Sequence, residues 1–173
     1  MSSVGVDGAE KLWSCVDDAP GDDTIKLRAI RVMDQNGNLK TEFRSSEIVL
    51  VELEANIIQL NSALTIGFDL TTSDGIVISR AYQNDPSPEW QPRLTIGINR
   101  LRCAIPAGLL NSGRYLIAPR ISLHCQKWIV NSEPCVSLNI LLDHGESPFW
   151  TIIGYQATRP GLIAPIWKWT VAG

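Results

Sequence analysis

Residues 102–117 read RCAIPAGLLNSGRYLI, and this stretch decides the fold because it joins two strand-like segments through a turn. Before the turn, apolar and polar side chains alternate up to Ile105, and Pro106 then removes a backbone donor and stops the ladder of hydrogen bonds. After the turn, Gly113 frees the backbone and Tyr115 begins a second alternation. The stretch therefore predicts a strand, a sharp crossing and another strand.

The rest of the chain repeats this pattern from Thr24 onward, and no segment has the period of a long amphipathic helix. The predicted strands are Ile25–Met33, Ile48–Ile57, Leu64–Thr71, Ile76–Ala81, Thr95–Ile105, Tyr115–Cys125, Cys135–Leu142 and Ile163–Val171. Such a series predicts an all-β fold, a two-layer antiparallel β-sandwich of about eight strands with immunoglobulin-like or jelly-roll-like connections. An irregular excursion with three prolines, Tyr82–Leu94, is expected to form the rim of a site.

Length and composition restrict the class of protein. A chain of 173 residues predicts one domain, at residues 13–173, after a flexible tail or linker remnant at residues 1–12. A net charge of −3 argues against nucleic acid as a partner. No apolar run approaches the roughly 20 residues that span a bilayer. The four cysteines fit neither a disulfide framework nor a zinc site, so they are interpreted as free thiols in a reducing compartment.

Three further motifs accompany the stretch at 102–117, and their order along the chain is informative. They are DQNG at residues 34–37, GFDLTTSDGIV at 67–77 and GLIAPIW at 161–167. In this order the four motifs resemble the C-terminal carbohydrate-binding domain of the ATPase subunit of O-antigen polysaccharide ABC transporters, the Wzt C-terminal family. The resemblance covers roughly residues 13–169, nearly the whole chain.

The resemblance implies an immunoglobulin-like arrangement and a function without catalysis. The implied function is recognition of an O-antigen or related bacterial surface polysaccharide, at its modified non-reducing end, coupled to export by an ABC transporter. It also implies a homodimer, a cytoplasmic location at the inner membrane, and the transporter's ATPase domain and membrane subunit as partners. Because the sequence contains no P-loop, ATPase activity is expected in a missing N-terminal domain. No cofactor and no metal are expected. The alternative is a β-sandwich that dimerises or contacts another protein and binds no glycan.

A carbohydrate site needs an aromatic face against the sugar ring and planar polar groups for its hydroxyls. Tyr82, Trp90 and Trp128 lie in or beside loops and are candidates for the aromatic face, with packed loop anchors as the alternative. Alternation turns polar side chains outward, away from the core, among them Ser122 and His124. The candidates for polar contacts are Glu52, Asp69 and Arg120. Their alternative is ordinary charge pairing between strands, together with Glu54 and Arg102.

Catalysis has little support in the sequence. The histidines are His124 and His144, and the adjacent His124 and Cys125 must point to opposite faces of a strand. A glycoside-cleaving pair such as Glu52 and Asp69 would need to converge in one cleft. The aspartates around Pro20-Gly21 are interpreted as a solvated loop rather than a calcium site.

The last predicted strand carries two tryptophans with the same orientation. Trp167 and Trp169 alternate with Ile166 and Lys168, so both should face the same way. Packing into the core is the expected arrangement. The alternative is an interface with a second copy, in which this strand is exchanged between protomers.

Overall fold

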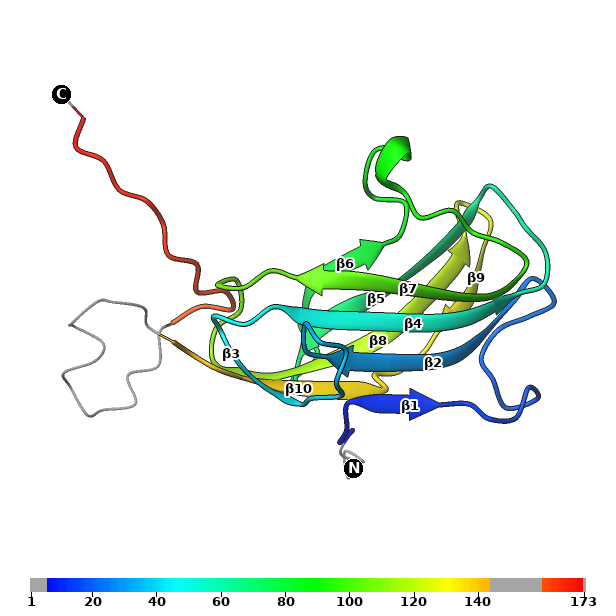
Figure 1. Ribbon diagram of the computed structural model, residues 1–173, viewed down its shortest axis with the longest axis horizontal. Coiled ribbons are helices and arrows are strands. Elements are labelled where there is room, and N and C mark those ends of the chain that lie inside the picture. Colours follow the sequence, from blue (N-terminus) through cyan, green and yellow to red (C-terminus); the bar gives the residue numbers. More distant parts are fainter. Residues whose placement is uncertain (1–5, 144–159, 173) are drawn as a thin grey trace.

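The computed structural model describes residues 6–143 and 160–172, and two β-sheets pack face to face in it (Figure 1). The four-stranded sheet contains, in spatial order, β1 (Glu10–Leu12), β2 (Ile25–Met33), β4 (Val49–Ile57) and β7 (Gly97–Ile105). The six-stranded sheet contains β3 (Glu42–Arg44), β10 (Val136–Leu141), β8 (Gly113–Leu123), β5 (Leu64–Thr72) and β6 (Val77–Tyr82), with β9 (Lys127–Asn131) also paired to β8. The prediction of an all-β, two-layer sandwich is confirmed. Among the described strands, β3 and β10 run parallel and the other pairs antiparallel.

The inner faces of the two sheets supply the core. Val49, Val51, Leu53 and Ala55 of β4 are buried, as alternation predicts, and Tyr115 and Ile117 of β8 meet them from the other layer. Each fully buried aliphatic or aromatic side chain stabilises the fold by about 1.5–3 kcal/mol relative to its exposed state. The long strands therefore form where the sequence alternates, because only that pattern buries one face of each sheet.

The stretch at residues 102–117 connects the two layers. It leaves β7 in the four-stranded sheet and enters β8 in the six-stranded sheet, so it is a crossing and not a hairpin. Gly113 has a φ of 149°, which side-chain-bearing residues rarely adopt. The Tyr115 hydroxyl donates a hydrogen bond of 2.8 Å to the carbonyl of Asn111, the tyrosine corner of immunoglobulin-like sandwiches. The spacing of glycine and tyrosine thus fixes how the chain changes sheets.

Three short strands were missed by the sequence analysis. β1 and β3 have three residues each, which is too short for alternation to identify them, and in β9 the apolar residues Trp128, Ile129 and Val130 are consecutive instead of alternating. β1 lies inside the stretch 1–12 that was expected to be a tail, yet it pairs with β2. In the described ranges, no helix is both long and apolar enough to cross a membrane, and the helical element is a 3₁₀ turn at Pro88–Trp90.

The predicted last strand, Ile163–Val171, was wrong. Its contacts with the sandwich include a bridge between Ile163 and Leu110 and a hydrogen bond of 2.9 Å from Ala164 N to the Leu109 carbonyl. Beyond them the chain projects away from both sheets (Figure 1). Trp167 and Trp169 are 68% and 91% exposed, so core packing of these residues is also wrong. The alternation is present, but residues 165–172 pair with no strand among the residues that the structure describes.

Candidate functional site

Four of the six predicted site residues lie on one surface, the outer face of the six-stranded sheet. Asp69 is on β5, Tyr82 on β6, Arg120 on β8 and Trp128 on β9. The register places Gly67 opposite Tyr82 on one side and opposite Arg120 on the other. Since all these positions alternate with core residues, their side chains share the outer face. We call this surface the six-stranded face.

A network of ion pairs around Asp69 organises the six-stranded face. The Asp69 carboxylate, 1% exposed, accepts hydrogen bonds from Arg80 Nε at 2.6 Å and Nη2 at 2.8 Å, and from Arg120 Nε at 2.9 Å. Arg120 Nη1 also donates to the carbonyls of Pro119 and Ser132, at 2.9 and 2.6 Å. Alternation places Asp69 correctly on the outer face, but the two guanidinium groups cover it. Asp69 therefore holds the guanidinium groups of Arg80 and Arg120 in position on this face.

The charges of this network are fixed at neutral pH. Burial raises the pKa of Asp69, but the hydrogen bond from Arg80 and the charges of Arg120 and Arg80 outweigh it, so the pKa lies below its usual value. The same hydrogen bond, which Asp69 accepts, raises the pKa of Arg80. Both partners thus stay ionised, and Arg80 presents a fixed, planar donor group on the six-stranded face.

Trp128 supplies aromatic surface to the candidate site, and the guanidinium of Arg80 lies over its ring. The Arg80 guanidinium carbon lies 5.3 Å from the centroid of the Trp128 ring, and Trp128 remains 47% exposed. Beside them is a hollow of about 410 Å³, which we call the polar hollow. It is lined by Arg80, Tyr82, Ser122, Leu123, His124, Cys125, Gln126, Lys127 and Trp128.

Gly67 shapes the second aromatic wall of the polar hollow. A Cβ atom added at Gly67 would lie 1.9 Å from the Ala81 carbonyl oxygen and 2.8 Å from the Tyr82 ring. The absence of a side chain therefore lets the Tyr82 ring lie close against the backbone of β5. The glycine is needed for packing here, since its φ is not in the left-handed region.

We expect Gly67→Ala to displace Tyr82 and to destabilise the sandwich by about 1–3 kcal/mol, as overpacking does. The check is thermal unfolding together with the NMR signals of the Tyr82 ring. Gly37→Ala is the control, because an added Cβ there meets nothing within 4 Å. The positive φ of Gly37 gives that variant a strain cost of its own, but it should leave the Tyr82 signals unchanged. Unshifted Tyr82 signals in Gly67→Ala would contradict this account.

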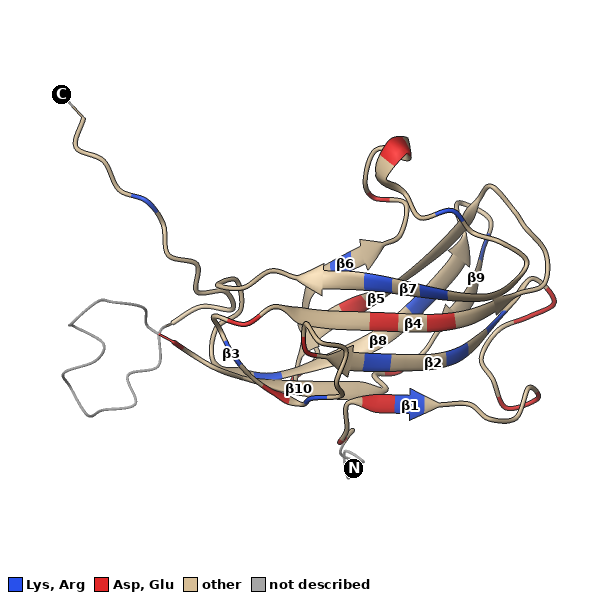
Figure 2. Ribbon diagram, in the orientation of Figure 1, with Lys and Arg blue, Asp and Glu red and all other residues tan. Residues whose placement is uncertain are grey.

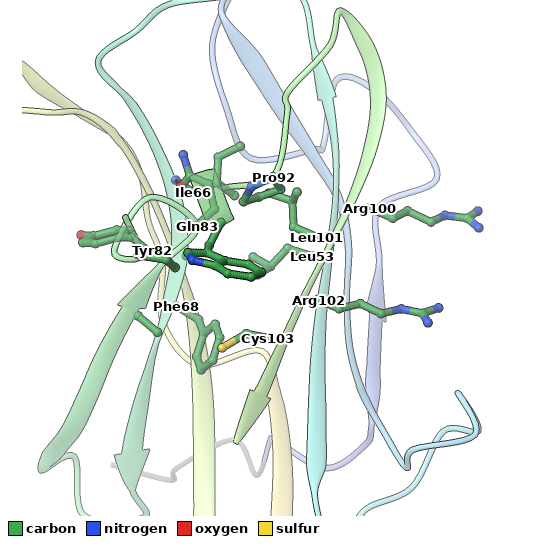
Figure 3. A pocket seen from close by; sticks show the side chains of 14 residues that line it. Leu53, Ile66, Phe68, Tyr82, Gln83, Pro92, Arg100, Leu101, Arg102 and Cys103 are labelled. Atoms are coloured by element: carbon green, nitrogen blue, oxygen red, sulfur yellow. Dashed lines mark hydrogen bonds between the residues drawn. The ribbon is translucent and has the colours of Figure 1, made fainter. Parts of the chain in front are cut away.

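Trp90 and Glu52 lie apart from the six-stranded face. Trp90, 77% exposed, is in the 3₁₀ turn of the loop after β6 and lines a second cavity of about 350 Å³. Figure 3 shows this cavity with Leu53, Phe68 and Cys103 around it. This cavity opens between the edge strands β6 and β7, and we call it the edge cavity. Tyr82 lines both the edge cavity and the polar hollow.

Glu52 belongs to a different charge network, on the outer face of the four-stranded sheet. Figure 2 shows a band of acidic and basic segments across β1, β2, β4 and β7. Glu52, 3% exposed, accepts hydrogen bonds from Arg31 at 2.8 Å and Arg102 at 2.7 Å, and Arg31 also pairs with Glu54 at 3.0 Å. Ordinary charge pairing explains these residues. Glu52 and Asp69 face opposite sides of the sandwich, so they do not form a hydrolytic pair.

Sequence analysis missed Arg80 as a member of the candidate site. Arg80 could have been found, because counting outward from the Asp74-Gly75 turn places it opposite Asp69, and the structure has that pair. His124, which alternation turned outward, lines the polar hollow, but from the turn between β8 and β9 rather than from a strand. His144 lies outside the described residues. Within residues 6–143 and 160–172, no three metal-ligating side chains gather to hold an ion.

The fold of the chain is similar to one in the crystal structure of the C-terminal domain of Wzt. The TM-score is 0.61, with 14% sequence identity over 94% of this chain and 89% of that chain. With 14% sequence identity, the similarity shows a shared fold. It confirms, for the fold, the resemblance drawn from the four sequence motifs. No family model matches the chain, and no curated protein matches it in sequence.

Proposed function

We propose that this chain recognises a bacterial surface polysaccharide without catalysis and binds it on the six-stranded face. The observation that carries the proposal is the half-exposed Trp128, which packs against Arg80 at the border of the polar hollow. The ligand is an O-antigen or related polysaccharide, bound at its modified non-reducing end. The similarity in fold to the C-terminal domain of Wzt supports this choice of ligand class.

The polar hollow has both elements that a sugar requires. Trp128 and Tyr82 offer aromatic surface to the C–H side of a pyranose ring. Arg80, Ser122 and His124 offer hydrogen-bonding groups along one border. An open site with few fixed contacts is expected to bind with millimolar to micromolar affinity, about −4 to −8 kcal/mol. Weak binding permits release of the polysaccharide into an exporter.

In this proposal, the domain selects the substrate of an ABC transporter. The ATPase domain and the membrane subunit of that transporter are its partners, and it acts at the cytoplasmic side of the inner membrane. Two sites tethered to one transporter would raise the effective affinity through local concentration. Recognition is then strong enough to select a polysaccharide, although each single site is weak.

The C-terminal segment is proposed to pair with a second copy of the chain. Residues 165–172 carry exposed Ile166, Trp167, Trp169 and Val171, which is a large apolar surface for a segment that does not pack on its own sandwich. A partner sheet edge would bury these side chains and satisfy the extended backbone. This surface is also the observation that favours the second candidate function, a dimerisation or protein-interaction module without a glycan.

We expect deletion of residues 165–173 to convert a homodimer into a folded monomer. The measurement is analytical ultracentrifugation over a range of concentrations, with circular dichroism to confirm that the β-sandwich persists. Lys168→Ala is the matched control, since it changes the same segment and leaves its apolar side chains in place. A full-length chain that is monomeric at all concentrations would contradict the proposed dimer.

Calorimetric titration with O-polysaccharide from the source organism tests the proposed function. Two preparations are compared, one with its natural non-reducing ends and one with the terminal residue removed. We expect saturable binding of the first and at least tenfold weaker binding of the second. If neither preparation binds at a millimolar concentration of non-reducing ends, glycan recognition is rejected. The second candidate function, a dimerisation or protein-interaction module, then remains.

A further inference from the structure

The edge cavity has a different chemistry from the polar hollow. Its floor and walls are formed by Leu53 of β4, Phe68 of β5, and Leu101 and Cys103 of β7 (Figure 3). Leu101 and Cys103 are partly buried against the core, and their strand is an edge of its sheet. The cavity exists because β6 and β7 are edge strands that do not pair with each other, so the inner faces of the two sheets are accessible there.

The polar groups around the edge cavity are turned away or already bonded. Figure 3 shows the side chains of Arg100 and Arg102 pointing away from the cavity. They pair instead with Glu54 at 2.9 Å and Glu52 at 2.7 Å on the outer face. Gln83 Oε1 accepts from Ile66 N, and its Nε2 donates 2.9 Å to the Leu64 carbonyl, so this amide is engaged with β5.

The thiol of Cys103, in the wall formed by β7, is uncharged. Burial, and then the nearby Asp85, raise the pKa of the Cys103 thiol, which keeps it protonated at neutral pH. The interior of the edge cavity is therefore suited to an apolar group. A cavity of about 350 Å³ falls within the range of small-ligand sites.

Two residues connect the edge cavity to ligand binding. Trp90 lines the edge cavity while its side chain remains 77% exposed. A ligand that covers this indole would bury a large aromatic surface. Tyr82 forms a wall of both the edge cavity and the polar hollow. A ligand that lies along Tyr82 can therefore place a polar ring in one hollow and an apolar substituent in the other.

We propose that the edge cavity is a second binding subsite, which takes an apolar substituent of the polysaccharide bound in the polar hollow. Such substituents are O-acyl and O-methyl groups or the methyl group of a deoxysugar. This inference rests on the proposed function, because the sugar in the polar hollow directs the substituent across Tyr82. Each buried CH₂ group is expected to strengthen binding by about fourfold.

Indole is the first probe, because it tests the cavity without any sugar. We expect millimolar indole to shift the methyl NMR signals of Leu53 and Leu101 in the wild type. Cys103→Phe should abolish these shifts by filling the cavity. Ala104→Phe is the matched control, since the next residue of β7 is exposed on the opposite face and should leave the shifts intact. No shift with indole in the wild type overturns the proposal.

The second step adds the O-polysaccharide to the indole complex and follows Trp128 at the same time. The proposal requires the polysaccharide to shift the Trp128 indole N–H and to displace indole from Leu53 and Leu101. A polysaccharide that shifts Trp128 but leaves indole bound overturns the second subsite while the proposed function stands. A polysaccharide that leaves Trp128 unshifted instead contradicts the proposed function and, with it, the link between the edge cavity and the glycan.

Discussion

Asp69→Asn is expected to lower the free energy of unfolding by about 3 kcal/mol, which corresponds to a fall in Tm of about 9 °C. The variant keeps the shape of the side chain but removes the charge that compensates two arginines. In this variant Arg120, which is largely buried, would keep an uncompensated charge away from water, whereas Arg80 is partly exposed to water. The expected loss of stability is therefore at the low end of the range for removing one partner of a buried ion pair. The measurement is chemical denaturation at pH 7.

Asp18→Asn is the control for this prediction, because Asp18 is an exposed aspartate in the loop before β2. It should change the free energy of unfolding by less than about 0.5 kcal/mol. Equal stability of the two variants would show that the Asp69 network does not organise the six-stranded face.

The effect of Asp69→Asn should also depend on pH with a defined sign. The pKa of Asp69 is lower in the folded than in the unfolded chain, so its stabilisation is fully present above the unfolded value of about 3.9. It is lost as the pH falls through the lower folded value. The difference between wild type and variant should therefore be constant between pH 5 and 7 and shrink below about pH 4.

Trp128→Ala is expected to weaken polysaccharide binding at least tenfold, or about 1.4 kcal/mol, because the ring surface that packs against the sugar is lost. Arg80 loses its stacking partner in the same variant, although Asp69 still holds its guanidinium. The measurement is calorimetry with a monovalent fragment, so that dimerisation does not affect the result.

Trp169→Ala is the matched control for Trp128→Ala. It removes another exposed indole, but from the C-terminal segment rather than from the six-stranded face. Its affinity for the monovalent fragment should equal that of the wild type. Equal losses in both variants would contradict a localised site at Trp128.

The long strands were predictable because their signal is local. β2 begins and ends at the predicted residues, since its apolar side chains alternate with polar ones on both sides of an irregularity between Leu27 and Ala29. Pro106 and Gly113 marked the crossing between the sheets because both act on their own backbone. β3 was missed because three residues are too few for an alternation, and β9 because its apolar residues are consecutive.

The site was predictable only in part, because alternation says whether a side chain points outward but not from which sheet. Glu52 and Asp69 have the same local pattern, yet β4 and β5 belong to different layers, and the two carboxylates end on opposite faces. Trp128 and Tyr82 were selected as aromatics outside the core pattern, and the structure places both on the six-stranded face. Their convergence depends on the order β9, β8, β5, β6, which long-range pairing determines.

The C-terminal segment shows another limit of prediction from alternation. Residues 163–171 have the alternation of a strand, and the pattern was recognised, but a strand also needs a partner edge. Beyond Ala164, this segment pairs with no strand in the part of the chain that the structure describes. A pattern of side chains cannot reveal whether the edge comes from the same chain or from another one.

The most direct test of the account is backbone chemical-shift mapping of the domain titrated with monovalent O-polysaccharide fragments. The account predicts saturable shifts at Arg80, Tyr82, Ser122, His124 and Trp128, with no shifts around Glu52 and Arg102 on the four-stranded sheet. Shifts confined to the four-stranded sheet, or a folded spectrum that does not respond at millimolar fragment, would contradict recognition of a glycan on the six-stranded face.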